Sequence, residues 1–309
     1  MDIECKECGG KFIDDKSLHH HLKLHKLKIG DYYLKHFRRK DLYNNELIPF
    51  KNFNQYFETD FLSKTNLRMW LKGQGKDVQR EYCTNLLKGR IDKKGLKYSP
   101  SQVELRSLPI PACNFYHNLF NGYNDFCIQL GLKTRFSNYP GDINYESVQN
   151  KVKHIICDSR EAKPLNLDFS IEISKLDFGD YCLDNPELNE RIYIERKSLP
   201  DLISSMTRGY ERFTSELERC ISSQSYLVIL VEEKIEHALS FNFLPHIHSK
   251  MNPDHVFHGI RDLLQKYKEI QFIFCNGRKE SARIAKRILF ENGLTRNCDL
   301  QLMLDIGLL

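Results

Sequence analysis

The strongest constraint on the fold comes from the second half of the chain, where short apolar segments alternate with amphipathic ones from residue 152 onward. The apolar segments "VKHIICD", "FSIEISKL", "RIYIERK", "YLVILVEE" and "IQFIFCN" have the length and composition of β-strands. The segments "SLPDLISSMTRGYERFTSELERCISS", "DHVFHGIRDLLQKYK" and "KESARIAKRILFENG" have the apolar periodicity of helices. This alternation predicts an α/β domain over residues 151–309, with a central mixed sheet flanked by helices.

Charged residues within the apolar segment "RIYIERK" are the first candidates for a functional site. Side chains alternate along a strand, so Glu195 and Lys197 share one face while Arg196 points to the other. Asp180 follows a glycine in "GDY", and Asp158 ends the apolar run "IICD". Such carboxylates can hold Mg²⁺ or Mn²⁺ at a phosphate, and a lysine beside them can orient the attacking water. The pattern favours phosphodiester hydrolysis; the alternative is a salt-bridge ladder on an exposed strand.

The series "DSRE", "GDY", "IERKSLPDL" and "GYERF" occurs in this order and resembles the XPF-type (ERCC4-domain) structure-specific nuclease domain. The resemblance implies a restriction-endonuclease-like fold. It implies a set of catalytic residues, namely Asp158, Arg160, Glu161, Asp180, Glu195, Arg196, Lys197 and Asp201. Within this set, Asp158, Asp180 and Glu195 are the expected Mg²⁺ or Mn²⁺ ligands, and Lys197 is the expected base or water-orienting group. Arg196, on the opposite face, is expected to tie the strand to a neighbouring carboxylate.

The segment after this signature is expected to form a helix that faces DNA. Its apolar positions form one stripe, made of Leu199, Leu202, Ile203, Met206, Tyr210, Phe213, Leu217 and Ile221. Arg208, Arg212 and Arg219 fall on the opposite side, where they can meet phosphates. For Arg219, which lies farthest along, a solvated helix face is the alternative interpretation.

The N-terminus carries a metal-ligand pattern. The four candidate ligands are Cys5, Cys8, His21 and His25, and twelve residues separate the two pairs, which is the spacing of a tetrahedral zinc site. Residues 1–28 therefore resemble a two-Cys-two-His zinc finger of ββα type, with Phe12 and Leu18 as its apolar plugs. In the docking manner of that family, Asp14, Lys16, Ser17 and His20 face the DNA major groove. The alternative role is a structural or protein-binding unit.

The middle of the chain is expected to be mainly helical. Residues 29–75 form a basic helical or linker segment, and residues 76–136 contain a helix, a turn capped at Ser99 into a second helix, and two short helices punctuated by Gly122 and Gly131. The motifs "YSPSQVEL", "LPIPACNFYHNLFNGY" and "LGL" make residues 76–136 similar to the helical repeat found beside homing endonuclease domains, which implies a DNA contact. The alternative is an ordinary helical spacer. Residues 137–150, rich in Pro, Gly, Asn and Ser, are expected to be a linker.

The charge and composition of the chain limit the kinds of partner and the cellular compartment that we expect. Residues 1–150 carry 24 Lys and Arg against 17 Asp and Glu, whereas residues 151–309 carry 22 against 24. A basic half suggests a polyanion partner, although two solvated surfaces would also satisfy this balance. We expect no membrane span, no signal peptide and reduced cysteines, hence an intracellular protein of the cytoplasm or nucleoid, or of the nucleus if the source is eukaryotic. A homodimer through the nuclease domain is a further hypothesis.

Together these patterns predict a metal-dependent DNA endonuclease, with Mg²⁺ or Mn²⁺ in the nuclease site and Zn²⁺ in the finger, acting on branched, flapped or site-selected DNA. The alternative is a DNA-binding protein that uses the nuclease fold as a non-cleaving scaffold. An RNA-directed protein ranks last, because aromatic RNA-stacking signatures are not evident.

Overall fold

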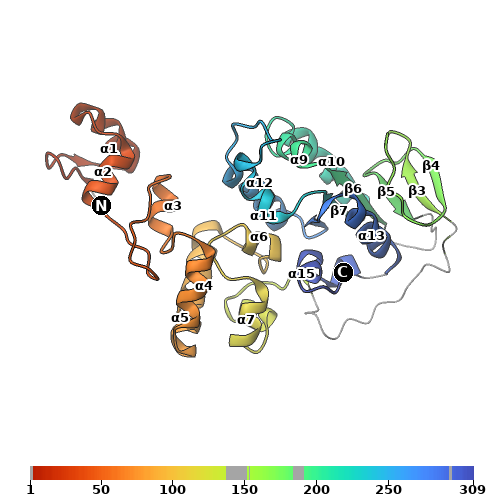
Figure 1. Ribbon diagram of the computed structural model, residues 1–309, viewed down its shortest axis with the longest axis horizontal. Coiled ribbons are helices and arrows are strands. Elements are labelled where there is room, and N and C mark those ends of the chain that lie inside the picture. The colour runs from red at the N-terminus through yellow and green to blue at the C-terminus, as the bar shows by residue number, and fades with distance from the viewer. Residues whose placement is uncertain (1–2, 137–151, 153, 184–190, 292–293) are drawn as a thin grey trace. The chain divides into compact units, whose positions relative to one another are not determined.

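The computed structural model describes residues 3–136, 152, 154–183, 191–291 and 294–309 (Figure 1). The predicted linker at 137–150 lies outside the described residues. The chain forms two compact units. The first comprises Met1–Cys83 with Pro109–Pro111, and the second comprises Thr84–Leu108 with Ala112–Leu309.

The first unit begins with a small hairpin and helix. Strands β1 (Ile3–Glu4) and β2 (Lys11–Phe12) pair antiparallel, and α1 (Asp15–His21) follows, continued by a 3₁₀ turn, η1 (Leu22–His25). Helices α2 (Ile29–His36), α3 (Phe53–Glu58) and α4 (Lys64–Lys72) follow, and the unit ends within α5 (Lys76–Lys94). The expected plug Leu18 is buried with Tyr32, Tyr33 and Tyr56 in one core, and Phe12 packs at its edge. The hairpin and α1 therefore share a core with α2 and α3.

The second unit is built on a six-stranded sheet. Its strands are β3 (Ile155–Asp158), β4 (Ile171–Ser174), β5 (Tyr181–Leu183), β6 (Ile192–Lys197), β7 (Tyr226–Val231) and β8 (Ile270–Phe274). The spatial order is β4-β3-β5-β6-β7-β8. β5 runs antiparallel to β3 and β6, and the other neighbours are parallel, so the sheet is mixed, as predicted. β5 has only three residues, too few for a detectable alternation, and the sequence did not predict it.

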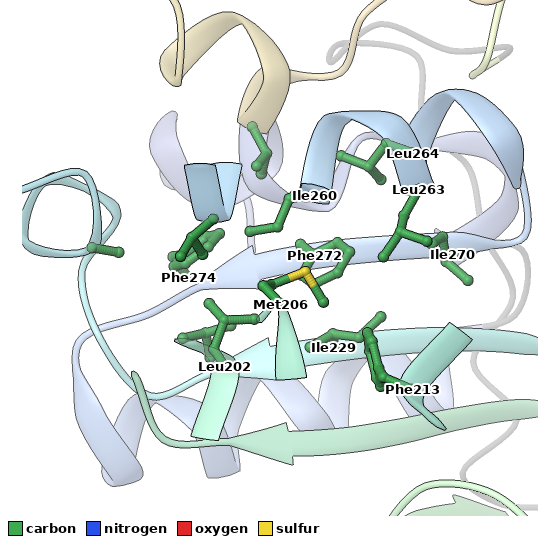
Figure 2. Close-up of a cluster of buried hydrophobic side chains, with 14 of the residues drawn as sticks. Leu202, Met206, Phe213, Ile229, Ile260, Leu263, Leu264, Ile270, Phe272 and Phe274 are labelled. Carbon is green, nitrogen blue, oxygen red and sulfur yellow. The ribbon is translucent and has the colours of Figure 1, made fainter. Parts of the chain in front are cut away.

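Helices cover both faces of this sheet. One face carries α9 (Leu199–Ser205), α10 (Tyr210–Ser222), α11 (Ile235–Ala238), the 3₁₀ turn η3 (Phe241–Phe243) and α12 (Pro253–Lys266). The other face carries α13 (Gly277–Phe290), α14 (Leu294–Asn297) and α15 (Leu300–Asp305). Figure 2 shows Leu202, Met206 and Phe213 packed against Ile229 and Phe272 of the sheet. Burying such side chains contributes about 1.5–3 kcal/mol each.

The single helix predicted over residues 198–223 is wrong, because α9 ends at Ser205 and α10 begins at Tyr210. The backbone N–H of Gly209 donates to the carbonyl of Ser204 at 2.9 Å, which closes α9 with a turn instead of continuing it. The predicted apolar stripe is nevertheless continuous across the break, and each of its residues lies in or against one core cluster.

Residues 84–108 and 112–136 pack onto the sheet's helices within the second unit. Their helices are the end of α5 (Lys76–Lys94), α6 (Gln102–Arg106), α7 (Cys113–Leu119) and α8 (Tyr123–Gln129). Val103 joins the core formed by α9, α10 and α12. The Gln102 N–H donates to Asp299 at 2.6 Å, and Arg106 forms an ion pair with Asp305 at 2.7 Å. The sequence-based division between residues 76–136 and 151–309 stays a prediction; in the second unit Val103 of the first segment packs into a core cluster of the second.

Two smaller sequence predictions have clear outcomes. The cap of α6 is Ser101 and not Ser99, because Ser101 and Glu104 form a capping box, whereas the Ser99 hydroxyl accepts the N–H of Arg135. None of the ten cysteines forms a disulfide, which agrees with the prediction of reduced cysteines, two of which, Cys5 and Cys8, are candidate metal ligands. In the part of the chain that the structure describes, helices are either too short or too polar to pass through a bilayer.

Candidate active site

Strand β6 places Glu195 and Lys197 on the same face of the sheet, as side-chain alternation predicts. Lys197 Nζ lies 2.9 Å from Glu195 Oε1, and their side chains are only 11% and 17% exposed. The ammonium also lies 5.0 Å from the ring centre of Phe213 on α10. The helix that covers this face therefore screens the pair from water, which strengthens its electrostatic interactions.

Asp180 reaches this site through a backbone turn that requires glycine. Gly179 has φ +60°, and a Cβ there would lie 2.9 Å from the carbonyl oxygen of Ile194. The Asp180 N–H donates to that same carbonyl at 2.7 Å, so the turn is seated directly on β6. This close approach explains the glycine of "GDY".

The Asp180 carboxylate is the electrostatically unusual group of the site. Its Oδ2 accepts the N–H of Arg196 at 2.7 Å, and its Oδ1 receives no hydrogen bond from the described residues. Burial, followed by the negative charge of Glu195, raises the pKa of Asp180 to about 7. The negative charges of Asp180 and Glu195 repel each other in this half-buried site. Their carboxylate oxygens are ligands that suit a hard divalent cation.

Asp158 lies at the end of β3 and is fully engaged by hydrogen bonds. Its Oδ1 accepts from the N–H and Nε of Arg160 at 2.7 Å each, and its Oδ2 accepts from Arg160 Nη2 at 2.9 Å and from the Leu176 N–H at 2.8 Å. These bonds, with the Arg160 charge, lower the pKa of Asp158 to about 2. Its role as a metal ligand stays a prediction. In the structure it holds Arg160, whose side chain is 68% exposed.

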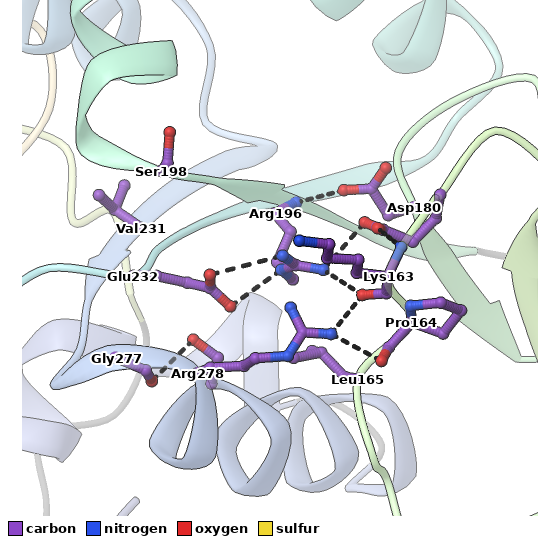
Figure 3. A network of polar contacts seen from close by, with 12 residues as sticks. Lys163, Pro164, Leu165, Asp180, Arg196, Ser198, Val231, Glu232, Gly277 and Arg278 are labelled. Atoms are coloured by element: carbon purple, nitrogen blue, oxygen red, sulfur yellow. Dashed lines mark hydrogen bonds and ion pairs between the residues drawn. The ribbon is translucent and has the colours of Figure 1, made fainter.

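Arg196 points to the opposite face of β6, where it lies between the carboxylates of Glu161 and Glu232. Figure 3 shows its contact with Glu232. It forms ion pairs of 2.9 Å with Glu161 and with Glu232, and Nη1 donates to the carbonyl of Lys163 at 3.0 Å. Arg278 of α13 donates to the carbonyls of Lys163 and Pro164 nearby. The expected tie between Arg196 and a neighbouring carboxylate is present, with Glu161 as one partner.

Asp201 lies in the first turn of α9 and is exposed. Its Oδ2 accepts the Ser198 hydroxyl at 2.6 Å, while the Ser198 Oγ accepts the Asp201 N–H at 3.3 Å. This reciprocal cap fixes the point where β6 passes into α9. Asp201 thus anchors the strand end that carries Lys197.

Two carboxylates of this region were missed by the sequence reasoning. Glu232 follows directly after β7 and pairs with Arg196. Glu216 lies on α10, three residues after Phe213 and hence on the same side of the helix. Burial, followed by the charge of Glu195, raises the pKa of Glu216. The sequence signal for Glu216 was its helical spacing from Phe213 within the apolar stripe.

The arginines predicted to meet DNA are all exposed. Arg208 lines a pocket of about 380 Å³ together with Thr207, His246, His248 and Lys250. Arg212 and Arg219 lie on the solvent side of α10, away from the buried stripe. Whether any of them contacts DNA stays a prediction.

The N-terminal cysteines and histidines converge in the first unit. Cys8 Sγ lies 3.2 Å from His21 Nε2, Cys5 Sγ lies 3.7 Å from His25 Nε2, and the two histidine nitrogens are 3.0 Å apart. Ligands about 2.0–2.3 Å from a tetrahedral zinc ion would be separated by similar distances. Among the described residues, this is the one group of three or more such ligand atoms within 4.8 Å of one another. The donor set fits zinc.

The residues of α1 and its cap that were predicted to face DNA differ in whether their side chains are already hydrogen-bonded. Asp14 caps the helix by accepting the Ser17 N–H at 2.8 Å, and it also accepts the Ser17 hydroxyl. Lys16 and His20 are exposed. Ser17 is therefore already hydrogen-bonded within the helix cap, whereas the side chains of Lys16 and His20 face solvent.

Comparison with known families addresses the region around β6. Residues 154–288 match the ERCC4 domain family. The match contains Asp158, Asp180, Glu195 and Lys197, and it confirms the predicted resemblance for this part of the chain. The ERCC4 domain is that of a structure-specific DNA nuclease family.

Solved structures similar to the chain include XPF from Aeropyrum pernix, alone and in complex with DNA. Each has 19% sequence identity and a TM-score of 0.34, and each match covers 44% of this chain. The matches cover 59% and 63% of those two chains, so this protein spans about three fifths of their length. No curated protein is significantly similar to the chain.

Proposed function

We propose that this chain is a divalent-metal-dependent endonuclease that hydrolyses phosphodiester bonds of DNA through the ERCC4 domain. The observation that carries the proposal is the juxtaposition of Asp180, Glu195 and Lys197 at the start and end of two neighbouring strands. A site of this kind, within a match to a nuclease family, combines ligands for a hard cation with a positive charge for phosphate.

In this proposal Asp180 and Glu195 hold the cation, and Asp158 supports them by fixing the end of β3. Mg²⁺ or Mn²⁺, when bound, supplies the positive charge that polarises a phosphate and neutralises its developing charge. Lys197 Nζ, held by Glu195, donates a hydrogen bond that orients the attacking water. Arg160, fixed on Asp158 yet largely exposed, is placed to meet a phosphate of the substrate.

The remaining catalytic candidates hold strand β6, which carries Glu195 and Lys197, in position. Arg196, with Glu161 and Glu232, keeps β6 in position, so that its own N–H reaches the Asp180 carboxylate. Asp201 holds the end of the same strand through Ser198. We class these as positioning residues.

DNA targeting is assigned to the basic N-terminal half. Zinc bound by the Cys/His cluster would hold the hairpin and α1 together, and the exposed Lys16 and His20 would approach DNA. Arg208 and Arg212 would contact phosphates beside the nuclease site. A homodimer through the ERCC4 domain remains part of the proposal, and sedimentation equilibrium of the full chain, with and without DNA, tests it.

The decisive experiment is a cleavage assay with labelled duplex, flap, fork and junction DNA in Mg²⁺ or Mn²⁺. Wild type is expected to cut at least one branched substrate, and Lys197→Ala is expected to lose about 100-fold or more in rate. Lys268→Ala, at an exposed lysine of the same domain, is the matched control and should cut normally. Equal cleavage by Lys197→Ala and wild type would refute the assignment of the site.

The same assay decides between cleavage and the scaffold alternative. DNA binding by wild type with no cleavage of any substrate in either metal would favour a non-cleaving DNA-binding protein. Competition with RNA of matched sequence separates a DNA-directed from an RNA-directed protein.

A further inference from the structure

The second unit contains a cationic pocket that the nuclease site does not include. The pocket has a volume of about 390 Å³ and lies between the C-terminal end of α5, the loop 95–98 and α12. Its charged lining residues are five cations and two carboxylates, namely Arg90, Lys94, Lys97, Arg261, Lys266, Glu104 and Asp262. The lining thus has an excess of positive charge.

The two carboxylates of the pocket are already engaged by other groups. Glu104 accepts the Ser101 N–H at 2.7 Å through Oε2, and Gln265 Nε2 at 2.9 Å through Oε1. Asp262 lies 2.9 Å from His258 Nδ1. Neither carboxylate is within ion-pair distance of Arg90 or Arg261, so neither neutralises the guanidinium groups directly.

The cations at the centre of the pocket, Arg90, Arg261 and Lys94, form no direct ion pair with another described residue. In the described part of the chain, Arg90 has no hydrogen bond or ion pair through its side chain. Among the described residues Arg261 donates only to Ser107, at 3.0 Å to its Oγ, and its buried Nε has no hydrogen-bond partner there. The closest polar partner of Lys94 Nζ is His258 Nε2 at 3.4 Å, a group that does not supply negative charge.

This arrangement is electrostatically costly without an anion. Burial, followed by the neighbouring charge of Arg90, lowers the pKa of Arg261 to about 10. Burial also lowers the pKa of Arg90. Guanidinium groups titrate far above neutral pH, so both stay charged and repel each other. An anion placed between them would remove this repulsion.

We propose that this pocket binds a phosphate group, held by the guanidinium groups of Arg90 and Arg261 and by Lys94. Arginine forks match phosphate oxygens bidentately, and lysine adds a point charge. The volume lies within the range of small-ligand pockets, about 300–1,000 Å³, so it accommodates a phosphate with its attached sugar.

The phosphate has two possible sources, the DNA backbone or a free nucleotide or polyphosphate. Only the DNA source rests on the proposed nuclease function. The probes are therefore inorganic pyrophosphate and a duplex DNA, each measured without added Mg²⁺ or Mn²⁺ and without a chelator, so that cleavage does not enter the result and the N-terminal cluster keeps its zinc. A failure of the nuclease proposal would appear in the cleavage assay and would leave the pyrophosphate measurement intact.

The test compares Arg90→Gln and Lys94→Gln with Lys88→Gln, a control on the exposed side of the same helix that carries the same charge change. All variants are first checked for wild-type helical content and melting temperature. Pyrophosphate binding by calorimetry is expected to weaken about tenfold or more in Arg90→Gln and severalfold in Lys94→Gln. Lys88→Gln should bind as wild type does.

Duplex binding at several salt concentrations then identifies the source. If the backbone occupies the pocket, Arg90→Gln reduces the slope of log K against log salt by about 1 relative to Lys88→Gln. Weaker pyrophosphate binding with unchanged DNA binding supports a free phosphate ligand. Absence of pyrophosphate binding by wild type, or equal behaviour of Arg90→Gln and Lys88→Gln toward both probes, overturns the proposal.

Discussion

Arg196 Nε lies 2.9 Å from Glu232 Oε1, and this ion pair joins the end of β6 to the residue that follows β7. Both side chains are mostly buried, at 14% and 16% exposure. The pair lies on the face of β6 opposite Glu195 and Lys197. It stabilises the strand that carries the candidate site without entering the site itself.

Replacing Arg196 with alanine should lower the free energy of unfolding by about 3 kcal/mol, because Glu161 and Glu232 would be left as buried charges without a partner. Urea denaturation followed by circular dichroism measures this loss. Arg219→Ala, at an exposed arginine, should stay within about 0.5 kcal/mol of wild type. An Arg196→Ala protein with wild-type stability but no cleavage would show that Arg196 acts on the substrate.

Gly179→Ala should damage both stability and activity. A Cβ at this positive-φ position would lie 2.9 Å from the Ile194 carbonyl oxygen, so the turn that presents Asp180 must move. We expect a loss of about 2 kcal/mol in unfolding free energy, together with a loss of cleavage of about 10-fold or more.

Gly89→Ala is the matched control for this substitution. Gly89 lies within α5 and a Cβ there meets no atom within 4 Å, so alanine should stabilise the protein by about 0.5–1 kcal/mol. If Gly179→Ala retained wild-type stability and cleavage, the turn would not be needed to place Asp180.

Glu216→Gln should weaken the response to metal. The side chain adds negative charge near Glu195, and removing this charge should reduce the attraction for a divalent cation by about 1 kcal/mol, or severalfold in affinity. The Mg²⁺ concentration for half-maximal cleavage is therefore expected to rise severalfold, while the rate at saturating Mg²⁺ changes little.

Glu211→Gln, on the exposed side of the same helix, controls for the change in net charge. A Mg²⁺ dependence of Glu216→Gln that matches both wild type and this control would remove Glu216 from the site.

Removing zinc should unfold more than the hairpin and α1. Cys5 shares a core with Tyr32, Tyr33 and Tyr56, so loss of the metal should also release α2 and α3. Elemental analysis is expected to find one zinc per chain in wild type and much less in Cys8→Ser, with lower helical content and weaker DNA binding. His20→Ala, outside the ligand cluster, should keep its zinc. A zinc-free wild type with full helical content would contradict the metal assignment.

The buried carboxyl group of Asp299 should make the free energy of unfolding depend on pH. Burial raises the pKa of Asp299 from 3.8 to about 6, so between these pH values the folded state binds a proton that the unfolded chain releases. The contribution of Asp299 to the free energy of unfolding is therefore fully present below about pH 4 and is lost as the pH rises through 6. The rise in pKa corresponds to about 3 kcal/mol at most.

Asp299→Asn should remove this slope, which urea denaturation at pH 3.5 to 7 can measure. Asp92→Asn, at an exposed position, is the control and should retain the wild-type profile. Parallel profiles for wild type and Asp299→Asn would show that folding does not shift the pKa of Asp299.

Local patterns in the sequence were sufficient for several features. The two-residue period of "RIYIERK" predicted that Glu195 and Lys197 share a face and that Arg196 does not. The spacing of two cysteines and two histidines predicted their convergence, and the ordered motifs around Asp180 and Glu195 predicted the ERCC4 match. These inferences succeed because each depends on residues close in sequence or on a motif with fixed spacing.

Only the tertiary structure decided which distant side chains complete these features. Glu232 meets Arg196 because β6 and β7 pair in parallel register. The charge of Glu216 acts on Glu195 because α10 covers the face of the sheet that carries Glu195 and Lys197. The cationic pocket likewise exists because α5 and α12, more than 150 residues apart, bring Arg90 and Arg261 together. Periodicity specifies which face of an element is buried, whereas strand pairing and helix packing determine what that face meets.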